Sequence, residues 1–371
     1  MKVCVVGAGN MGLAMASVLA MDEKYEPVLY TGKQIDTEAL ILDDVENGVK
    51  YQDFAFDVEG DIAKALDGAE YVFVTWPAFL RRRFAEQATP HLGKGAKVGF
   101  VPGYGGAEYM CKEMIENGVV VFGFQRVPYV ARKTDTEATI QSRKNELFLA
   151  SIPKDALPQI CKDVEEMFHI PTVALKEYLA VTLAPTNPLI HLSGVYDIFK
   201  DLPNGAPYEG DPMFYEQWRD ETSRIMFAYD DELQEVCRRM APMDLSEIVS
   251  LKIHYESPTP EALTKKLKSI PSLYNVVKVP LVEKDGKMYP DFNNRMFVED
   301  FPYGIAIIKF FALATGVETP TVDKILAFYK EKTGIEYYKE DGTPGKDFAD
   351  TGIPSVFGLN TLEDVIGFYQ Q

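Results

Sequence analysis

The chain opens on KVCVVGAGNMGLAMASVLAM, residues 2–21. Lys2 to Val6 is a short apolar, β-branched run, which is typical of a strand buried on both faces. The run stops at Gly7, and Gly7, Gly9 and Gly12 stand at the spacing GxGxxG. Because this motif follows a predicted strand and opens a predicted helix over residues 11–21, it has the context that dinucleotide binding requires. We therefore predict a Rossmann-like unit at the start of the chain.

Each glycine of this loop has a physical task. Gly7 permits a tight turn, Gly9 lets a pyrophosphate approach the backbone, and Gly12 lets the helix pack on its strand. The first N–H groups and the dipole of the helix favour phosphate groups at its N-terminus. The candidate coenzyme-binding residues of the loop are Gly7, Gly9, Asn10, Met11 and Gly12.

The composition is that of an ordinary globular protein large enough for two domains. The chain has 371 residues, of which 46% are hydrophobic and 25% charged. Its net charge of −18 argues against nucleic acid and anionic membrane surfaces as partners, because both are negatively charged. A small anionic substrate remains compatible with this charge, since a few local arginines can bind it.

The cysteines and apolar runs predict a cytoplasmic protein. Cys4, Cys111, Cys161 and Cys237 show no CxxC spacing, so we expect reduced thiols and no metal site. No apolar run reaches the ~18 residues of a membrane span. The first strand starts at Lys2, so we expect no signal peptide. The oligomeric state is left open, with a homodimer as one option.

The end of the second predicted strand, Pro27 to Tyr30, bears on the choice of coenzyme. An NAD enzyme usually places Asp or Glu about 20 residues after the glycine motif, where it binds the ribose hydroxyls. Here the chain reads Thr31, Gly32, Lys33. A hydroxyl and a cation suit a 2′-phosphate, so we favour NADP(H) over NAD(H). In the alternative, Thr31 and Lys33 form a solvated turn and Asp36 reaches the ribose.

Strands and helices then alternate, which predicts a parallel sheet. We expect helices over residues 62–66, 82–88, 107–117 and 157–168. We expect strands over residues 71–75, 97–101, 119–124, 137–142, 146–151 and 172–175. Loops containing Pro77 and Gly103 follow two of the strands. Since ligands of such sheets bind outside the carboxyl ends of strands, we expect both residues to border the coenzyme. We interpret Arg81 to Arg83 as a solvated helix face.

After Glu177 apolar residues recur mainly at helical spacing. Helical segments are expected within residues 178–192, 214–237, 260–267, 303–314 and 321–329. We place the boundary near Ala180, with a dinucleotide-binding domain over 1–180 and a substrate-binding and catalytic domain over 181–371. The predicted fold is an α/β Rossmann-like domain joined to a mainly α-helical C-terminal domain, with an active site in the cleft between them.

The second domain contains the most informative polar residues. His191 follows Asn187 by four residues and shares its helical face, and Arg295 precedes Asp300 by five. Hydride transfer to an oxo acid or imine needs a cation that binds a carboxylate and an acid that protonates the reacting centre. Arg295 suits the first role, and a histidine supported by an aspartate suits the second. His91, His169 and His254 are weaker candidates.

These segments resemble the opine dehydrogenase family, which includes octopine, nopaline and N-(1-carboxyethyl)-norvaline dehydrogenases. The resemblance covers nearly the whole chain. It rests on residues 7–12 (GAGNMG), 102–106 (PGYGG), 187–191 (NPLIH), 294–300 (NRMFVED), the helix of 304–314 and 317–321 (VETPT). Only the first of these is generic, and the family's order along the chain is kept.

The resemblance implies that an amino acid and a 2-oxo acid such as pyruvate condense to an imine, which a nicotinamide coenzyme reduces to a secondary-amine dicarboxylate. By position, His191 resembles the family's catalytic histidine and Asp300 its carboxylate partner. Arg295 is similar to the arginine that holds a substrate carboxylate, and Asn187 and Arg132 are further candidates for substrate binding. The departure at Thr31 to Lys33 leaves the coenzyme open between NADP and NAD.

Two other functions are compatible with these patterns. A 2-oxo-acid reductase of the ketopantoate reductase type has a similar coenzyme domain and helical partner, but is expected to use a catalytic lysine. A catalytically inactive NADP(H)-binding sensor would not need His191, Arg295 and Asp300 together. Reduction of an oxo acid without an amino acid would favour the first, and absence of turnover the second.

Overall fold

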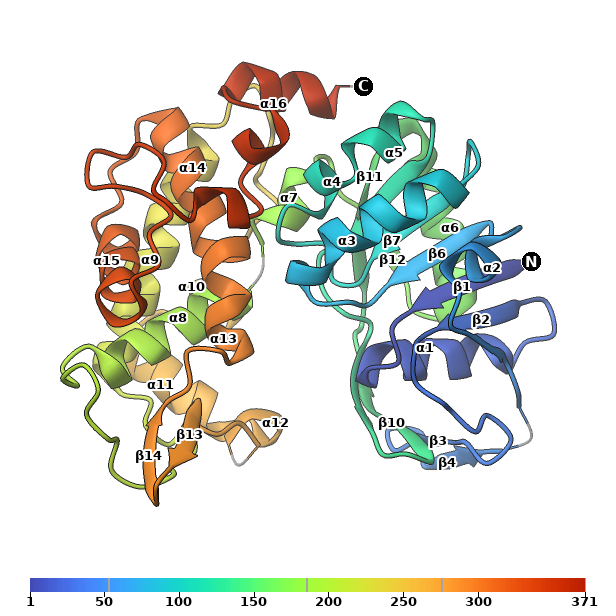
Figure 1. The fold of residues 1–371 in the computed structure, drawn as a ribbon, viewed down its shortest axis with the longest axis horizontal. Coiled ribbons are helices and arrows are strands. Elements are labelled where there is room, and N and C mark those ends of the chain that lie inside the picture. Colours follow the sequence, from blue (N-terminus) through green and yellow to red (C-terminus); the bar gives the residue numbers. More distant parts are fainter. Residues whose placement is uncertain (53, 185, 275, 371) are drawn as a thin grey trace. The chain divides into compact units, whose positions relative to one another are not determined.

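The computed structural model describes residues 1–52, 54–184, 186–274 and 276–370. It divides into two compact units (Figure 1). The first, called the coenzyme unit below, contains Met1–Thr182 and Ile366–Gln371, and the second, called the helical unit, contains Leu183–Val365. The last residues, assigned from sequence to the second domain, therefore belong to the coenzyme unit.

The coenzyme unit is built on an eight-stranded sheet. Its strand order is β12-β11-β8-β7-β6-β1-β2-β5, and every neighbouring pair is parallel except β11 with β8. The strands are β1 (Lys2–Val6), β2 (Glu26–Tyr30), β5 (Asp57–Glu59), β6 (Tyr71–Val74), β7 (Lys97–Phe100), β8 (Val120–Phe124), β11 (Leu147–Ile152) and β12 (Thr172–Ala174).

Helices connect these strands, as the alternating pattern predicts. They are α1 (Asn10–Ala20), α2 (Ile62–Leu66), α3 (Ala78–Ala88), α4 (Ala107–Met110), α5 (Lys112–Glu116), α6 (Leu157–Phe168) and α7 (Leu179–Thr182), with short 3-10 turns at Thr89–His91 and Lys154–Ala156. The helix expected over 107–117 is divided into α4 and α5 at Cys111. The four cysteines are free and buried.

A second, four-stranded sheet with the order β4-β3-β10-β9 was not predicted as a sheet. It consists of β3 (Ile41–Asp44), β4 (Val49–Tyr51), β9 (Tyr129–Lys133) and β10 (Glu137–Arg143). Helix α1 contacts β9 and β10, and Leu42, Ala131 and Ile140 join the same buried cluster as Leu13 of α1. The first helix is therefore covered by apolar side chains from both sheets, which explains why it is apolar nearly all round.

The helical unit contains α8 (Thr186–Phe199), α9 (Asp220–Arg238), α10 (Leu251–His254), α11 (Pro260–Ser269), α12 (Pro271–Tyr274), α13 (Arg295–Val298), α14 (Ala306–Thr315) and α15 (Pro320–Thr333). A π-helical turn covers Phe301–Ile305, and 3-10 turns cover Phe348–Asp350 and Pro354–Phe357. Helix α16 (Leu362–Tyr369) starts in this unit and ends in the coenzyme unit. An antiparallel hairpin, β13 (Leu281–Lys284) with β14 (Lys287–Pro290), was not predicted.

The helix expected from residue 214 begins only at Asp220. The N–H of Phe214 donates to the carbonyl of Val277 at 2.8 Å, and Met213 forms an isolated antiparallel bridge with Lys278. Residues 214–216 then form a turn, so the helix cannot start there. Pro185, inside the helical stretch expected over 178–192, lies outside the described residues.

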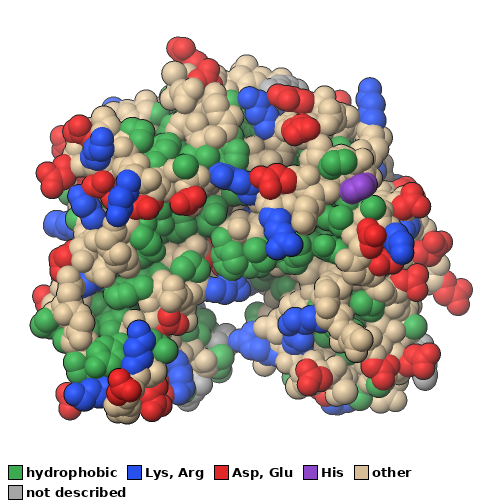
Figure 2. Space-filling model, in the orientation of Figure 1, with side chains coloured by type: hydrophobic (Ala, Val, Ile, Leu, Met, Phe, Trp, Pro, Cys, Tyr) green, Lys and Arg blue, Asp and Glu red, His purple; other side chains and the backbone are tan. Residues whose placement is uncertain are grey.

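Acidic and basic side chains are interspersed on the face drawn in Figure 2, over both units. Across the described ranges, we find no helix whose length and hydropathy would let it cross a bilayer.

Candidate active site and coenzyme loop

His191 and Asp300 form a direct pair within the helical unit, although 109 residues separate them. The imidazole Nδ1 lies 2.7 Å from the carboxylate Oδ2 of Asp300. The His191 side chain is 21% exposed and that of Asp300 only 4%. With Nδ1–H donated to the carboxylate, Nε2 is the nitrogen left to exchange a proton with a substrate.

The local fold explains why these two residues meet. His191 lies on α8, and Asp300 immediately precedes the π-helical turn. A Cβ on Gly304 would lie 2.7 Å from the side chain of Pro188, so only glycine lets this turn approach α8 so closely. The Phe214 ring also packs against the imidazole in a T-shaped arrangement, with 6.3 Å between ring centroids. A π-helical turn at this point agrees with the tendency of such turns to occur at functional sites.

Asp300 is almost fully buried, and this has an electrostatic consequence. Burial raises the pKa of its carboxyl, while the neighbouring imidazole acts in the opposite direction. An ionised carboxylate at this position therefore depends on His191 as its partner.

Arg295, the predicted carboxylate-binding residue, is the first residue of α13. Its Nε donates to Oε2 of Glu299 at 2.8 Å, within an i,i+4 ion pair. The side chain of Arg295 is 69% exposed, whereas that of Glu299 is 4% exposed. Glu299 thus fixes one edge of the guanidinium while most of the arginine faces solvent. The sequence alone had not indicated a role for Glu299.

Asn187 lies on the first turn of α8, four residues before His191, and is exposed. Arg132 lies on β9 of the small sheet, and its guanidinium donates to the carbonyl of Ala131 at 2.9 Å. The structure therefore joins His191 with Asp300, but it places Arg132 in the other unit.

The glycine loop has the geometry that the motif predicts. Gly7 has a φ of +107°, and a Cβ there would lie 2.7 Å from Cδ1 of Trp76. A Cβ on Gly12 would lie 1.8 Å from the carbonyl oxygen of Gly7, so the helix could not pack as it does. A Cβ on Gly9 would meet no atom within 4 Å, which leaves open space where a pyrophosphate would approach.

The start of α1 also suits an anion. Its N-cap residue Gly9 provides no side-chain cap, and the first turn, which includes Asn10 and Met11, carries no acidic residue. Within this turn the helix dipole and the backbone N–H groups are therefore not neutralised by a carboxylate.

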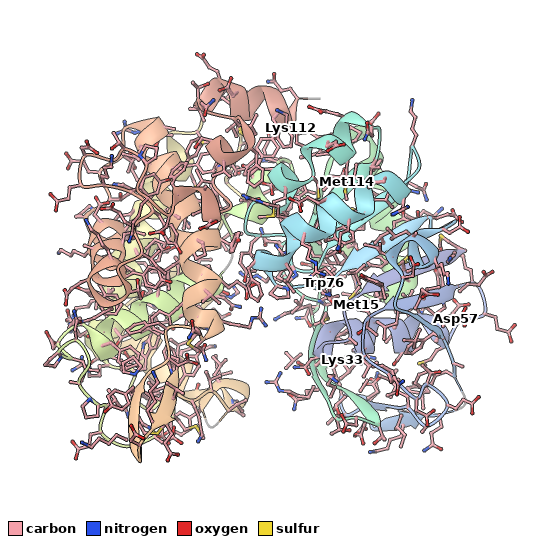
Figure 3. The ribbon with its side chains drawn as sticks, viewed as in Figure 1. Met15, Lys33, Asp57, Trp76, Lys112 and Met114 are labelled. Atoms are coloured by element: carbon pink, nitrogen blue, oxygen red, sulfur yellow. The ribbon has the colours of Figure 1, made fainter. Side chains whose placement is uncertain are left out.

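A hollow of about 600 Å³ lies beside the end of β2. Its lining includes Thr31 and Lys33, the two residues predicted to favour NADP(H) over NAD(H). It is lined by Thr31, Gly32, Lys33, Gln34, Ile35, Asp36, Val58 and Gly60. Oδ1 of Asp36 accepts backbone N–H groups of Glu38 and Ala39, both at 3.2 Å, so it stabilises a local turn. Figure 3 labels Lys33 in the coenzyme unit.

The loops after β6 and β7 contain Trp76, Pro77 and Gly103. Pro77 is the N-cap residue of α3, and the Trp76 ring lies 5.8 Å from that of Tyr30 (Trp76 is labelled in Figure 3). Gly103 is buried, and a Cβ there would lie 2.7 Å from Cα of Gly123. Packing inside the unit therefore also requires a glycine at this position.

The interpretation of Arg81 to Arg83 as a solvated face is wrong for Arg81, which is 1% exposed. Consecutive helical residues point in directions about 100° apart, so a run of three spans about 200° of the helix and its first or last residue can reach the face that packs on the sheet. The helical positions of the three arginines were therefore the sequence signal that one of them could be buried.

Comparisons with known proteins agree with this architecture. Residues 174–333 match the family model described as NAD/NADP octopine/nopaline dehydrogenase, alpha-helical domain. The octopine dehydrogenase of Pecten maximus is 24% identical over 399 aligned residues, covering 98% of each chain. The opine dehydrogenase of Haliotis discus hannai is 26% identical over 330 residues, covering 82% of this chain and 80% of that protein. A solved structure of octopine dehydrogenase in complex with NADH and agmatine has a TM-score of 0.85 at 23% identity, covering 100% of this chain and 98% of that one.

The fold and these relatives define an oxidoreductase that works with a nicotinamide dinucleotide. Within that class, the chain is similar to the opine dehydrogenases over nearly its whole length.

Proposed function

We propose that this protein joins an amino acid to a 2-oxo acid such as pyruvate, with NADPH as the preferred reductant. The amine and the keto group lose water to form an imine, and reduction gives a secondary-amine dicarboxylate. The observation that carries this proposal is the His191–Asp300 pair, with Arg295 on the same unit.

In this proposal His191 moves the proton. Its Nδ1 is held by Asp300 at 2.7 Å, so Nε2 is the atom that polarises the oxo acid and later protonates the nitrogen of the reduced product. Asp300 stabilises the imidazolium and fixes the orientation of the ring. When bound, the nicotinamide supplies the hydride for the imine carbon.

Arg295 binds the carboxylate of the oxo acid in this proposal. Glu299 holds the Nε edge of its guanidinium, and the exposed remainder of the side chain meets the substrate. Two substrates held in the correct orientation react faster because translational and rotational freedom has already been removed. Asn187, exposed at the start of α8, is proposed as a further substrate contact.

The coenzyme residues are proposed from the coenzyme unit alone. Gly7, Gly9, Asn10, Met11 and Gly12 hold the pyrophosphate, and Pro77 and Gly103 border the dinucleotide. Thr31 and Lys33 favour the 2′-phosphate of NADPH, and they line one hollow. Since Oδ1 of Asp36 accepts two backbone N–H groups, this carboxylate is less suited to bind a ribose diol.

A coenzyme-oxidation screen tests the proposal directly. NADH and NADPH are each crossed with several 2-oxo acids, and every pair is measured with and without a panel of amino acids. We expect oxidation only when an oxo acid and an amino acid are both present, with NADPH preferred. Oxidation with the oxo acid alone would replace this function with a 2-oxo-acid reductase. Coenzyme binding without turnover would indicate a sensor.

A further inference from the structure

A buried arginine holds both loops that are proposed to border the coenzyme. The guanidinium of Arg81, on α3, donates to three backbone carbonyls: from Nε to Trp76 at 3.3 Å, from Nη2 to Pro102 at 2.8 Å, and from Nη1 to Tyr104. Trp76 belongs to the loop after β6, and Pro102 and Tyr104 to the loop after β7. One planar cation therefore connects two loops at adjacent strand ends.

The Arg81 side chain also contacts aromatic rings. Its guanidinium carbon lies 5.5 Å from the ring centroid of Tyr104 and 5.6 Å from that of Phe100. These contacts, together with the three carbonyls, offset part of the desolvation of a buried cation. The residue cannot also bind substrate, because it is 1% exposed.

A buried carboxylate, Glu108 on α4, lies next in this network. It interacts electrostatically with Arg81 and is 0% exposed. Its Oε1 accepts the hydroxyl of Tyr369 at 2.8 Å and also the hydroxyl of Thr182. Burial raises the pKa of Glu108 to about 7, so at pH 8 most of this carboxyl is ionised and balances the charge of Arg81.

Tyr369, at the end of α16, brings the C-terminal residues into the same cluster. It is 2% exposed, its hydroxyl pairs with that of Tyr109 at 2.5 Å, and its ring stacks on Tyr178 with a centroid distance of 6.4 Å. Thr182 is the residue where the chain leaves the coenzyme unit, and Ile366 is where it returns. Oε1 of Glu108 therefore binds two residues, Thr182 and Tyr369, that lie close to the two points where the chain passes between the units.

We propose that Arg81 is a positioning residue of the coenzyme site, and that Glu108 and the C-terminal Tyr369 hold it in place. The proposal deepens the proposed function, since it assumes that the loops after β6 and β7 border the dinucleotide. Arg81 acts through the carbonyls of these loops and does not touch the coenzyme. Removing the Tyr369 hydroxyl, 288 positions along the chain from Arg81, therefore weakens coenzyme binding.

The experiment compares single variants of the full chain at pH 8. Arg81→Lys keeps the charge, but an ammonium group lacks the planar fork that spans three carbonyls. Tyr369→Phe keeps the ring and removes only the hydroxyl. The matched controls are Arg83→Lys, an exposed residue of the same helix, and Tyr338→Phe, whose hydroxyl donates to the carbonyl of Ala306 in the helical unit at 3.0 Å.

The readouts are the Kd for NADPH and NADH by calorimetry, kcat at saturating coenzyme, and amide hydrogen exchange of residues 102–106. We expect Arg81→Lys to raise both Kd values about tenfold or more and Tyr369→Phe to raise them about twofold to tenfold, with kcat nearly unchanged. Exchange in 102–106 rises in both variants, and in neither control. The two substitutions are also non-additive, because they act through one network.

If either variant folds and retains the wild-type Kd and exchange, the positioning role is overturned. A lower Tm with unchanged Kd and exchange would likewise reduce Arg81 to a purely structural residue. If Arg81→Lys does not fold, the Tyr369→Phe result decides. If the wild-type protein binds no dinucleotide, the proposed function fails, and the exchange of residues 102–106 still decides whether Tyr369 holds this loop.

Discussion

Nδ1 of His191 lies 2.7 Å from Oδ2 of Asp300, across 109 positions of the chain. The Asp300 side chain is 4% exposed, so its charge is little screened by water and acts mainly on the imidazole. We therefore expect proton transfer by His191 to depend on Asp300.

Replacing His191 with Ala lowers kcat by about two to four decades, because the group that moves the proton is lost. The Kd for the coenzyme, measured by calorimetry, stays within about twofold, since the proposed coenzyme residues are all in the other unit. His91→Ala, an exposed histidine of the coenzyme unit, is the matched control and keeps full activity.

Asp300→Asn lowers kcat in the same way, and the double variant with His191→Ala loses little more than His191→Ala alone. Independent, additive losses would show that the two residues do not act as a pair. A fully active His191→Ala enzyme would remove the catalytic assignment altogether.

Arg295→Ala raises the KM for the oxo acid by about tenfold to a hundredfold, because a charge-assisted hydrogen bond to its carboxylate is lost. Steady-state kinetics with the oxo acid varied and the amino acid saturating gives this value. Arg224→Ala is the control, since Arg224 forms exposed ion pairs with Glu221 and Glu261 on the same unit. An unchanged KM in Arg295→Ala would argue against carboxylate binding by this residue.

Alanine substitutions in the glycine loop separate coenzyme binding from folding. Gly9→Ala folds normally, because its φ of −79° suits alanine and its Cβ meets no protein atom. It raises the coenzyme Kd about tenfold or more, since the methyl group occupies the space for the pyrophosphate. Thermal unfolding and calorimetry give the two quantities.

Two further glycine substitutions serve as controls for Gly9→Ala. Gly12→Ala prevents normal folding, because its Cβ would lie 1.8 Å from the carbonyl oxygen of Gly7. Gly93→Ala, in an open loop with no atom within 4 Å, changes neither Tm nor Kd. Wild-type coenzyme affinity in Gly9→Ala would mean that no pyrophosphate approaches this loop.

Lys33→Ala raises the Kd for NADPH about tenfold and leaves that for NADH nearly unchanged, since only NADPH carries the 2′-phosphate. Lys112→Ala, on α5 of the same unit, is the charge-matched control (Figure 3). Equal losses for both coenzymes would contradict the assignment. An increase in the NADH Kd of Asp36→Ala alone would favour the alternative ribose contact.

The stability of the helical unit depends on pH through Asp230. Burial raises the pKa of this carboxyl to about 6. The folded state therefore binds the proton more tightly than the unfolded state, and the resulting stability is present below pH ~4 and lost as pH rises through about 6.

We expect Asp230→Asn to remove this dependence, because the amide oxygen can still accept the N–H of Leu251. Chemical denaturation between pH 4 and 7 should then show the wild type losing about 1–3 kcal/mol relative to the variant. Glu221→Gln, at an exposed carboxylate of the same helix α9 that does not act on Asp230, is the control and leaves the pH profile intact. Parallel profiles for the wild type and Asp230→Asn would disprove the prediction.

Local patterns were enough to predict the first parallel strands of the coenzyme unit. β1, β2, α2 and α6 match the expected segments to within one residue, because apolar runs, glycines and helical spacing are properties of neighbouring residues. The short strands β3, β4 and β5 were missed, since a run of three or four residues carries little periodicity. Their pairing with β2 and β10 depends on distant parts of the chain.

The candidate site shows the same division. The sequence alone determined the GxGxxG turn and the set of residues from which a catalytic histidine and its partners could be chosen, because spacing and side-chain chemistry are written in the chain. Only the tertiary structure decided that His191 meets Asp300, that Arg295 shares its guanidinium with Glu299, and that Arg81 is buried. Each of these depends on which face of a helix is covered by another element, and a long-range packing contact leaves no regular trace in the order of the residues.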